Sequence, residues 1–392
     1  MDKPRLLFLC SRFPWPLDKG DKLRAYHQVK ELSRHFRIIL FCLSLKKVSS
    51  AQISHLSPFC EYIEVFPISP LRAAIQLLKG VLDKRPFQVV LFAHKKAFQR
   101  CDACVEKYLP RVVFAQMVRT AEYARKYTIF TRCLDYMDAL SAGMERRISI
   151  ANPFIRPFVK SEFKRLQRFE SELQEDFKYK FIISDQDRMA IRHSNNSNIF
   201  VIPNGLSASF LNASRNTQAQ VDIIFTGNMS YKPNEKAAFF LVKEVFPLLP
   251  PSTRIKICGK SPGRSLRNLS SPRIDVSGWV SDMSVELSNA RLMAAPMFLG
   301  SGLQNKLLEA MACGLPCITT SMANNALRAT PETEILIADT AGDFAHQITR
   351  LLSDDVLANN IGIAGKAYVK NNFDWQHIGE NLAGIIKGQV TL

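Results

Sequence analysis

The sequence predicts an α/β protein made of two doubly wound domains with parallel sheets. Three observations support this fold class. Short, near-continuous apolar runs alternate with helical stretches along the chain, which is the order of a parallel sheet with crossover helices. A length of 392 residues suits two domains of ordinary size. A polar stretch at 212–220 interrupts the alternation, which then starts again.

The first domain is predicted to span residues 1–203. Residues 5–10 are a near-continuous apolar run, as expected of a strand buried on both faces. A loop containing Pro14, Pro16 and Gly20 leads to an amphipathic helix at 22–35. Apolar runs then predict strands at 37–45, 62–67, 88–92, 112–116, 132–136 and 180–184.

The second domain is predicted to span residues 204–370. The boundary is placed at the strand and turn 201–205, and the polar linker precedes the first strand of the second domain. Its strands are expected at 222–226, 254–258, 274–276, 292–295, 316–320 and 335–338. Residues 371–392 are expected to form a separate terminal helix that begins beside Trp375.

The net charge of +17 is concentrated in one half of the chain. Residues 1–200 hold 35 of the 52 basic and 20 of the 35 acidic residues, a net +15. Such a half can meet nucleic acid, anionic lipid or an anionic substrate. No nucleic-acid module is visible, so we expect no nucleic-acid partner. The Phe-rich basic stretch 152–168 and the stretch 71–85 suit an anionic membrane surface, or equally a core-facing helix with a solvated basic face.

The location predicted from the sequence is the cytoplasm. The longest apolar runs are far shorter than the roughly 20 residues of a membrane helix, and we expect no cleaved signal peptide. Nine scattered cysteines, several inside strand-like segments, are typical of buried thiols in a reducing compartment. Cys101 and Cys104 form a Cys-x-x-Cys without a second pair, so a zinc site is not favoured.

The window 300–316 carries the strongest chemical signal. A strand leads to a glycine-bearing loop and a helix from about Leu303, whose N-terminus is suited to a diphosphate. Lys306 adds a positive charge in the first turn, and Glu309 lies on the same helical face, where it could hold ribose hydroxyls. An ordinary helix with a surface Lys–Glu pair explains these residues as well. Gly314 and Pro316 end the helix and open the next strand.

These residues carry a family resemblance. Residues 301–320 resemble the donor-nucleotide motif of GT-B glycosyltransferases of the family-4 type, whose core is Leu-Glu-Ala-Met-Ala-Cys-Gly-x-Pro. A bacterial subgroup of exopolysaccharide-type sugar transferases is similar also in Gly-x-Gln-Asn-Lys. Five further stretches agree with this subgroup in the same order: 13–24, 134–141, 202–205, 225–229 and 232–234. The resemblance implies two Rossmann-like domains that face a central cleft, and a terminal helix that crosses back to the first.

The resemblance also implies roles for individual residues. Gly20 would let the first loop approach the donor diphosphate, because a side chain would block it. Gly227 and Asn228 would face the same cleft. Many relatives have an arginine at Asn228, and Lys232 is expected to replace it in part. Lys306 would neutralise phosphate, which makes it a catalytic candidate, and Glu309 would hold the ribose.

One departure from the family pattern concerns the donor sugar. Many members have a glutamate where this chain has Ser301. The backbone N–H groups of Gly302 and Leu303 could still bind the donor, but the contact of that glutamate with the sugar is missing. A donor-binding protein without transferase activity is therefore an alternative, and a GT-B nucleotide-sugar epimerase is another.

Candidates in the first domain follow one of its strands. Asp135 and Asp138 come at its carboxyl end, where open sheets bind ligands. We expect one of them to face the cleft and favour Asp138, as a contact of the acceptor or the sugar, although it could equally cap the next helix. Neither His27 nor His94 is favoured as a base.

The function expected from the sequence is therefore retaining sugar transfer in cell-surface polysaccharide biosynthesis. The donor would be a nucleotide sugar and the acceptor a glycan or a lipid-linked molecule. No metal or other cofactor is expected, because Lys306, the loop N–H groups and the helix dipole would stabilise the leaving diphosphate.

Overall fold

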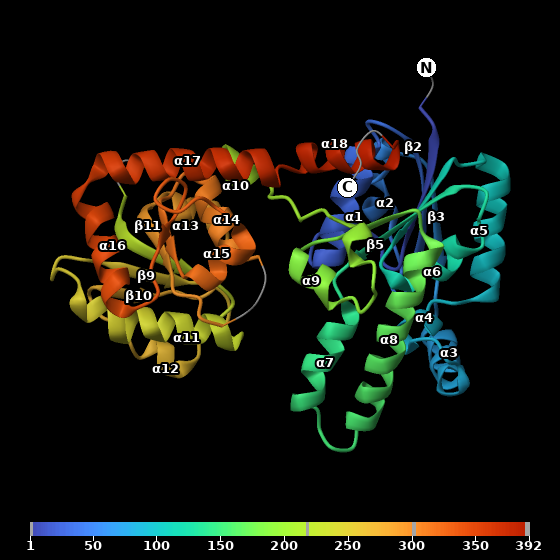
Figure 1. Cartoon of the computed structure of the whole chain (residues 1–392), viewed down its shortest axis with the longest axis horizontal. Helices are drawn as coiled ribbons and strands as arrows, with labels where there is room; N and C mark the ends of the chain where they lie inside the picture. The colour runs from blue at the N-terminus through green and yellow to red at the C-terminus, as the bar shows by residue number, and fades with distance from the viewer. Residues whose placement is uncertain (1–2, 217–218, 300–302, 389–392) are drawn as a thin grey trace. The chain divides into compact units, whose positions relative to one another are not determined.

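The computed structural model describes residues 3–216, 219–299 and 303–388. The chain divides into two compact units, and the first is discontinuous: it comprises the segment up to Asn204 and the segment from Trp375 onward. Gly205–Asp374 make up the second unit. Each unit holds one parallel sheet flanked by helices (Figure 1). The predicted fold class, two Rossmann-like doubly wound domains, is thus confirmed.

The sheet of the first unit has the strand order β3-β2-β1-β4-β5-β6-β7. Its central strand is apolar on both sides: Leu6 and Phe8 face one core cluster, and Leu7 and Leu9 face another. The apolar run at the start of the chain is therefore a strand buried on both faces. The strands are β1 (Arg5–Cys10), β2 (Arg37–Ser44), β3 (Cys60–Pro67), β4 (Val112–Gln116), β5 (Thr131–Met137), β6 (Tyr179–Ile182) and β7 (Ile199–Val201).

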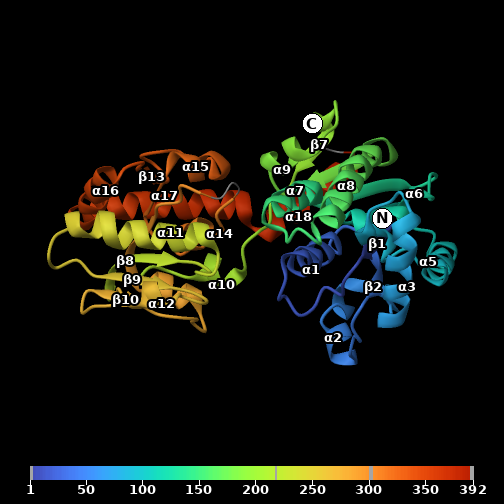
Figure 2. The same ribbon diagram turned by 90° about the horizontal axis from the view of Figure 1, so that it is seen from below.

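The helices of the first unit cover both faces of that sheet. They are α1 (Gly20–Leu32), α2 (Ser50–Ser54), α3 (Pro70–Leu82), α4 (Phe87–Val90), α5 (Lys95–Tyr108), α6 (Val118–Arg125), α7 (Leu140–Ile150), α8 (Arg156–Asp176), α9 (Asp185–Ala190) and α18 (Trp375–Ile386), with short 3₁₀ turns at Ser57–Phe59 and Asn196–Asn198. Figures 1 and 2 show α1 and α18 on one side and α5 and α6 on the other. A Cβ atom on Gly379 of α18 would lie 2.2 Å from the Cβ atom of Glu31, so these two helices are in backbone-close contact.

The prediction of a strand at 88–92 is wrong, because the chain forms α4 there. Pro86 precedes the helix, and the carboxylate of Glu162 accepts hydrogen bonds from the N–H groups of Phe87 and Gln88, at 2.7 and 3.2 Å. A distant carboxylate thus satisfies the free donors of this first turn. An apolar run of this length fits a buried helix and a strand equally well.

The sheet of the second unit has the order β10-β9-β8-β11-β12-β13, that of a nucleotide-binding Rossmann sheet. Its strands are β8 (Val221–Thr226), β9 (Ile255–Cys258), β10 (Ile274–Val276), β11 (Ala290–Ala295), β12 (Cys317–Thr319) and β13 (Leu336–Ile337). Its helices are α10 (Ala208–Asn212), α11 (Lys232–Phe240), α12 (Arg264–Arg267), α13 (Met283–Ser288), α14 (Asn305–Ala312), α15 (Ser321–Leu327), α16 (Ala341–Ser353) and α17 (Asp355–Phe373), with a π turn at Leu241–Val245 and a 3₁₀ turn at Phe246–Leu248.

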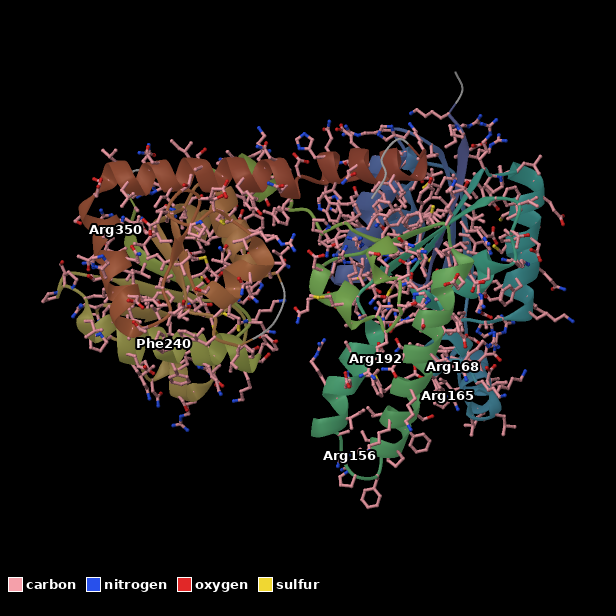
Figure 3. All side chains as sticks on the ribbon, in the orientation of Figure 1. Arg156, Arg165, Arg168, Arg192, Phe240 and Arg350 are labelled. Atoms are coloured by element: carbon pink, nitrogen blue, oxygen red, sulfur yellow. The ribbon has the colours of Figure 1, made fainter. Side chains whose placement is uncertain are left out.

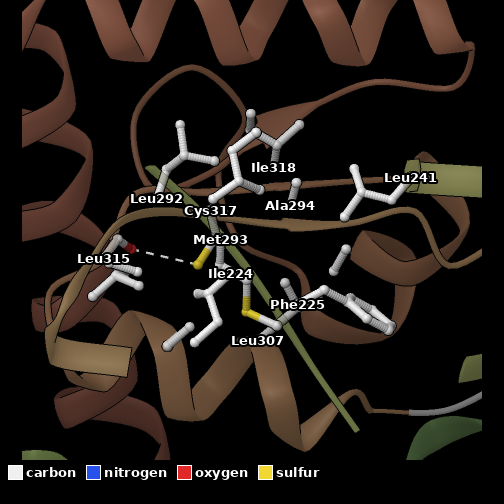
Figure 4. Packing of buried hydrophobic residues seen from close by; sticks show 14 of the residues in the cluster. Ile224, Phe225, Leu241, Leu292, Met293, Ala294, Leu307, Leu315, Cys317 and Ile318 are labelled. Atoms are coloured by element: carbon white, nitrogen blue, oxygen red, sulfur yellow. Dashed lines mark hydrogen bonds between the residues drawn. The ribbon is translucent and has the colours of Figure 1, made fainter. Parts of the chain in front are cut away.

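The core of the second unit fixes the position of α14. Figure 4 shows Leu307 of α14 beside Ile224 and Phe225 of β8 and Met293 of β11, and all four side chains are fully buried. The polar residues of the same helix are thereby directed away from the core. In the described part of the chain, every helix is too short or too polar to cross a bilayer.

Candidate donor-binding site

A cavity of about 490 Å³ opens in the second unit at the carboxyl ends of its strands. The strand order reverses there, since β8 lies between β9 and β11, and open α/β sheets bind ligands at such a point. The cavity is lined by the loops after β8, β9 and β10 and by the start of α14, with the residues Thr226, Gly227, Asn228, Gly259, Lys260, Trp279, Val280, Ser281, Met283, Leu303, Asn305, Lys306 and Glu309.

Two glycines let the loops after β8 and β9 pass in direct backbone contact. Gly259 has φ +138°, and a Cβ atom there would lie 1.9 Å from the carbonyl oxygen of Gly227. A Cβ atom on Gly227 would in turn lie 2.8 Å from Nδ2 of Asn234. Residue 259 must therefore be glycine, and a side chain at Gly227 would displace the amide group of Asn234. This side of the cavity is therefore lined by backbone atoms without side chains, which a ligand can approach closely.

Lys306 is held in place by neighbouring polar side chains. Its Nζ donates to Oδ1 of Asn234 at 2.9 Å and to Oε1 of Gln304 at 3.0 Å. Asn234 is buried, and its Nδ2 donates to the carbonyl oxygen of Asn228 at 3.0 Å. The ammonium group is thus tied through Asn234 to the loop after β8. Lys306 and this loop form one preorganised wall of the cavity.

Burial shifts the pKa values of both charged groups of α14 toward neutrality. It lowers the pKa of Lys306 to about 8, although the carboxylate of Glu309 acts to raise it. It raises the pKa of Glu309 to about 7, although Lys306 acts to lower it. Both groups therefore lack full solvation, and an exposed surface pair would show no such shifts. An anion in this cavity would stabilise the charged form of Lys306.

The other residues expected in the donor site are only partly brought together. Asn228 lines the cavity, but its Oδ1 accepts from Ser230 N–H and Oγ at 3.1 and 2.8 Å, so it shapes its own turn. Leu303 lines the cavity too, while Ser301 and Gly302 lie outside the described residues.

The expectation for Lys232 does not fit the geometry. Its Nζ lies 2.7 Å from Oε2 of Glu235, its side chain is 79% exposed, and it is not one of the described residues that line the cavity. Lys232 is the first residue of α11, and the carboxylate of Glu235, three residues later, forms an ion pair with it. Lys260, which follows β9, provides the second cation of the cavity instead.

In the first unit, the two aspartates after β5 have different surroundings. Asp135 is fully buried and forms an ion pair with Arg24, whose Nε lies 2.6 Å from Oδ2. Gln28 donates to the same carboxylate at 2.6 Å, and Arg24 also donates to Oδ1 of Asn204 at 2.9 Å. Asp135 is therefore part of the core. The Arg24–Asp135 pair connects α1 with the end of β5, and Arg24 also connects α1 with Asn204.

Asp138 is the less enclosed of the two and has a perturbed pKa. Burial raises this pKa to about 6, and the carboxylate of Asp187 adds to the effect. Gly20, at the start of α1, is close to Met137, the last residue of β5: a Cβ atom on Gly20 would be 3.3 Å from Cε of Met137. Gly20 and Asp138 thus share the carboxyl edge of the first sheet.

Sequence reasoning missed several residues at these two edges. In the second unit they are Asn234 as the support of Lys306, together with Gly259, Lys260 and the 67% exposed Trp279. In the first unit they are Arg12, which follows β1, and Arg119 at the start of α6. Burial lowers the pKa of Arg119, and Arg12 nearby adds to the effect. A lone lysine or arginine after a strand is too common a pattern to single out.

The remaining titratable candidates are structural. The ring of His27 stacks on that of Trp375 with centroids 4.5 Å apart, and burial lowers the pKa of this histidine to about 4. His94 is buried beside the carbonyl oxygen of Leu91. Cys101 is a buried thiol whose pKa burial raises to about 12. Among the described residues, no three His, Cys, Asp or Glu side chains are grouped as a metal site requires.

Comparisons with known proteins agree with this geometry. Residues 220–354, which include the cavity, match the family described as glycosyl transferases group 1. Sucrose-phosphate synthase from Thermosynechococcus elongatus has a similar structure, with a TM-score of 0.64, 17% identity and 98% of each chain covered. HepE from Anabaena in complex with UDP has a TM-score of 0.63 and 13% identity, over 98% of this chain and all of that one.

The chain has the GT-B fold. Its second unit contains the segment that matches the group 1 glycosyl transferases. A curated relative is 30% identical over 83 residues: the GDP-mannose-dependent monoacylated alpha-(1-6)-phosphatidylinositol monomannoside mannosyltransferase of Corynebacterium glutamicum. That match spans 21% of this GT-B chain and about a fifth, 22%, of the relative.

Proposed function

We propose that this protein transfers a sugar, with retention of configuration, from a nucleotide-sugar donor to a glycan or lipid-linked acceptor in cell-surface polysaccharide biosynthesis. The observation that carries the proposal is the cavity of the second unit, where Lys306 and Glu309 face one ligand-sized space beside a bare glycine backbone. Retention, acceptor class and pathway follow from the sequence resemblance. HepE was crystallised with UDP and the curated relative is named for GDP-mannose, which supports a nucleoside diphosphate sugar as donor.

The donor would lie along the cavity in a defined direction. Lys306 and Lys260 would neutralise the diphosphate, aided by the first-turn N–H groups of α14. Glu309, one turn further along, would accept hydrogen bonds from the ribose, and the exposed ring of Trp279 offers a stacking surface for the base. As the bond to the sugar breaks, negative charge grows on the diphosphate, and these fixed cations stabilise it. No cofactor is needed for this step.

The first unit would supply the acceptor side. Asp138 and Arg119 lie near the carboxyl edge of its sheet, together with Arg12, which forms an ion pair with Asp21 at 2.7 Å. We place the protein in the cytoplasm, where its nine free cysteines would stay reduced. The basic charge of residues 1–200 would bring it to the anionic inner face of the membrane.

A donor screen tests this function. The purified protein is incubated with UDP-, GDP- and ADP-sugars, and thermal stabilisation, nucleotide release and the anomeric configuration of the product are measured. One donor class should stabilise the protein, and nucleotide release should depend on an added glycan or lipid-linked acceptor. Tight nucleotide binding without turnover over a broad acceptor panel would instead identify a donor-binding protein.

Donor affinity should depend on pH through Lys306. Because the pKa of this lysine is about 8, affinity for the donor is expected to fall as the pH rises above 8, where the ammonium loses its proton. Glu309→Gln should weaken binding about tenfold through lost charge-assisted hydrogen bonds. It should also move the midpoint to lower pH, because Glu309 normally raises the pKa of Lys306. Calorimetry between pH 7 and 9 measures both effects.

The matched control for this pH experiment is Glu235→Gln. Glu235 lies near the same loops but pairs with Lys232, outside the cavity lining. It should leave affinity and midpoint unchanged. An unchanged midpoint in Glu309→Gln would show that the two groups of α14 do not interact in the donor site.

A further inference from the structure

Helix α3 presents its apolar side to solvent. Leu71, Leu78 and Leu82 are 71%, 72% and 92% exposed, and they follow one another on a single helical face. Ile75 and Val81 extend the same face and are exposed as well. A soluble helix normally buries such a stripe against its own protein. Here the stripe points outward, which marks an interaction surface.

The helix is firmly attached along its opposite side. Gly80 is its one buried residue, and a Cβ atom there would lie 2.9 Å from the ring of Phe87. Arg165 of α8 donates to the carbonyl oxygen of Gly80 at 2.6 Å and packs its guanidinium over the ring of Phe87 at 4.5 Å. Arg168 donates to the carbonyl oxygen of Lys84 at 3.0 Å. These two arginines of the stretch 152–168 therefore anchor α3 and the segment that follows it. The orientation of the exposed face of α3 is thereby fixed relative to the rest of the unit.

A second apolar projection lies at the turn between α7 and α8. Phe154 is 89% exposed, and Ile155 and Phe158 are exposed beside it. In Figure 1, α3 and this turn lie at the same end of the first unit, and Figure 3 shows Arg156 at the turn. Aromatic and aliphatic side chains with adjacent arginine are typical of segments that enter a membrane interface.

Cations flank the apolar face on one side. Arg72 and Lys79 of α3, with Lys95 of α5, line a cavity of about 420 Å³ that also includes His94 and Arg85. Arg85 is engaged by Asp83 and Glu122. Arg72, Lys79 and Lys95 form no ion pair within the described part of the chain, so their charge is available to an external anion.

We propose that the outward face of α3, together with the α7–α8 turn, docks onto an anionic lipid bilayer. The leucines of α3 enter the interface, while Arg72, Lys79 and Lys95 meet lipid phosphate groups. Charge complementarity selects the bilayer: protein interfaces are depleted in lysine, whereas anionic lipid attracts it. The inference rests on the proposed function only in that a lipid-linked acceptor would lie in this same bilayer.

Vesicle co-sedimentation of the full chain tests the surface. The wild type should bind vesicles of phosphatidylglycerol and phosphatidylcholine, bind phosphatidylcholine alone far less, and dissociate as salt rises. Replacing Leu71, Leu78 and Leu82 by Ser should weaken binding at least about tenfold. Replacing Arg72, Lys79 and Lys95 by Gln should weaken it about 10²-fold and remove most of the salt dependence.

Matched controls lie on the second unit. Val356 and Ile363 are 71% and 61% exposed on α17, and their replacement by Ser should leave vesicle binding unchanged. Replacing Lys236, Arg267 and Lys370, all exposed, by Gln removes the same number of charges as the charge variant and should also leave binding unchanged. Donor binding, measured in parallel without vesicles, should be that of the wild type in every variant, so that a failed donor site and a failed membrane surface are distinguishable. Equal binding to neutral vesicles, no binding at low salt, or wild-type binding by the leucine variant would overturn the proposal.

Discussion

Lys306→Ala is expected to lower turnover by about 10²–10³-fold, the range for the loss of one group that stabilises transition-state charge. Lys306 is one of two cations among the described lining residues, and its side chain is already oriented by Asn234 and Gln304. The donor cavity would then lose a fixed positive charge where the leaving diphosphate gains negative charge. Steady-state kinetics with the donor found in the screen measures the effect, and circular dichroism monitors the fold.

Lys232→Ala is the matched control for this prediction. It is a lysine in the first turn of the neighbouring helix α11, but it is exposed and paired with Glu235. The activity of this variant should stay within about twofold of the wild type, because an exposed ion pair contributes little free energy. Near-normal turnover in a folded Lys306→Ala protein, or an equal loss in both variants, would refute the assignment of Lys306.

Arg24→Met is expected to destabilise the first unit by about 3–5 kcal/mol, the cost of leaving a buried charge without its partner. Both Arg24 and Asp135 are fully buried, and Asn204 also receives a hydrogen bond from the guanidinium. The double variant Arg24→Met with Asp135→Asn should recover part of the loss. The amide carries no charge and can still accept the hydrogen bond from Gln28.

Urea unfolding measures this destabilisation. Trp15 and Trp375 lie in the first unit and Trp279 in the second, so a Trp279→Phe background reports the first unit alone by fluorescence. A loss below about 1 kcal/mol would mean that water reaches the pair. A double variant no more stable than the single would show that the unpaired charge is not the cause.

The sequence was informative wherever a pattern is local. Continuous apolar runs identified the strands because both faces of a parallel sheet are buried, as Leu6 and Leu7 show by facing different cores. Lys306 and Glu309 were identified from their place after a strand and at the start of a helix. The run at 88–92 was misjudged, because the carboxylate of Glu162 that favours a helix there is more than seventy positions away in the chain.

Residues whose role depends on distant partners could not be identified in this way. Gly259 must be glycine because the carbonyl oxygen of Gly227 comes close in space, which no local pattern encodes. Arg24 of α1 and Asp135 of β5 both belong to stretches that resemble the family. Only the structure shows that these two residues, 111 positions apart, meet in one buried ion pair. Part of the family resemblance therefore reflects folding of the first unit.

The discontinuity of the first unit also bears on its synthesis. Trp375 and Leu382 of α18 belong to the same buried cluster as Ala25 and Val29 of α1, so the cover of α1 comes from the far end of the chain. A ribosome adds about 5–20 residues per second, and the whole second unit must emerge before α18 does. For roughly ten seconds or more, the nascent first unit exposes the apolar surface of α1. During that interval it is a substrate for chaperones, and the second unit can finish folding before the first.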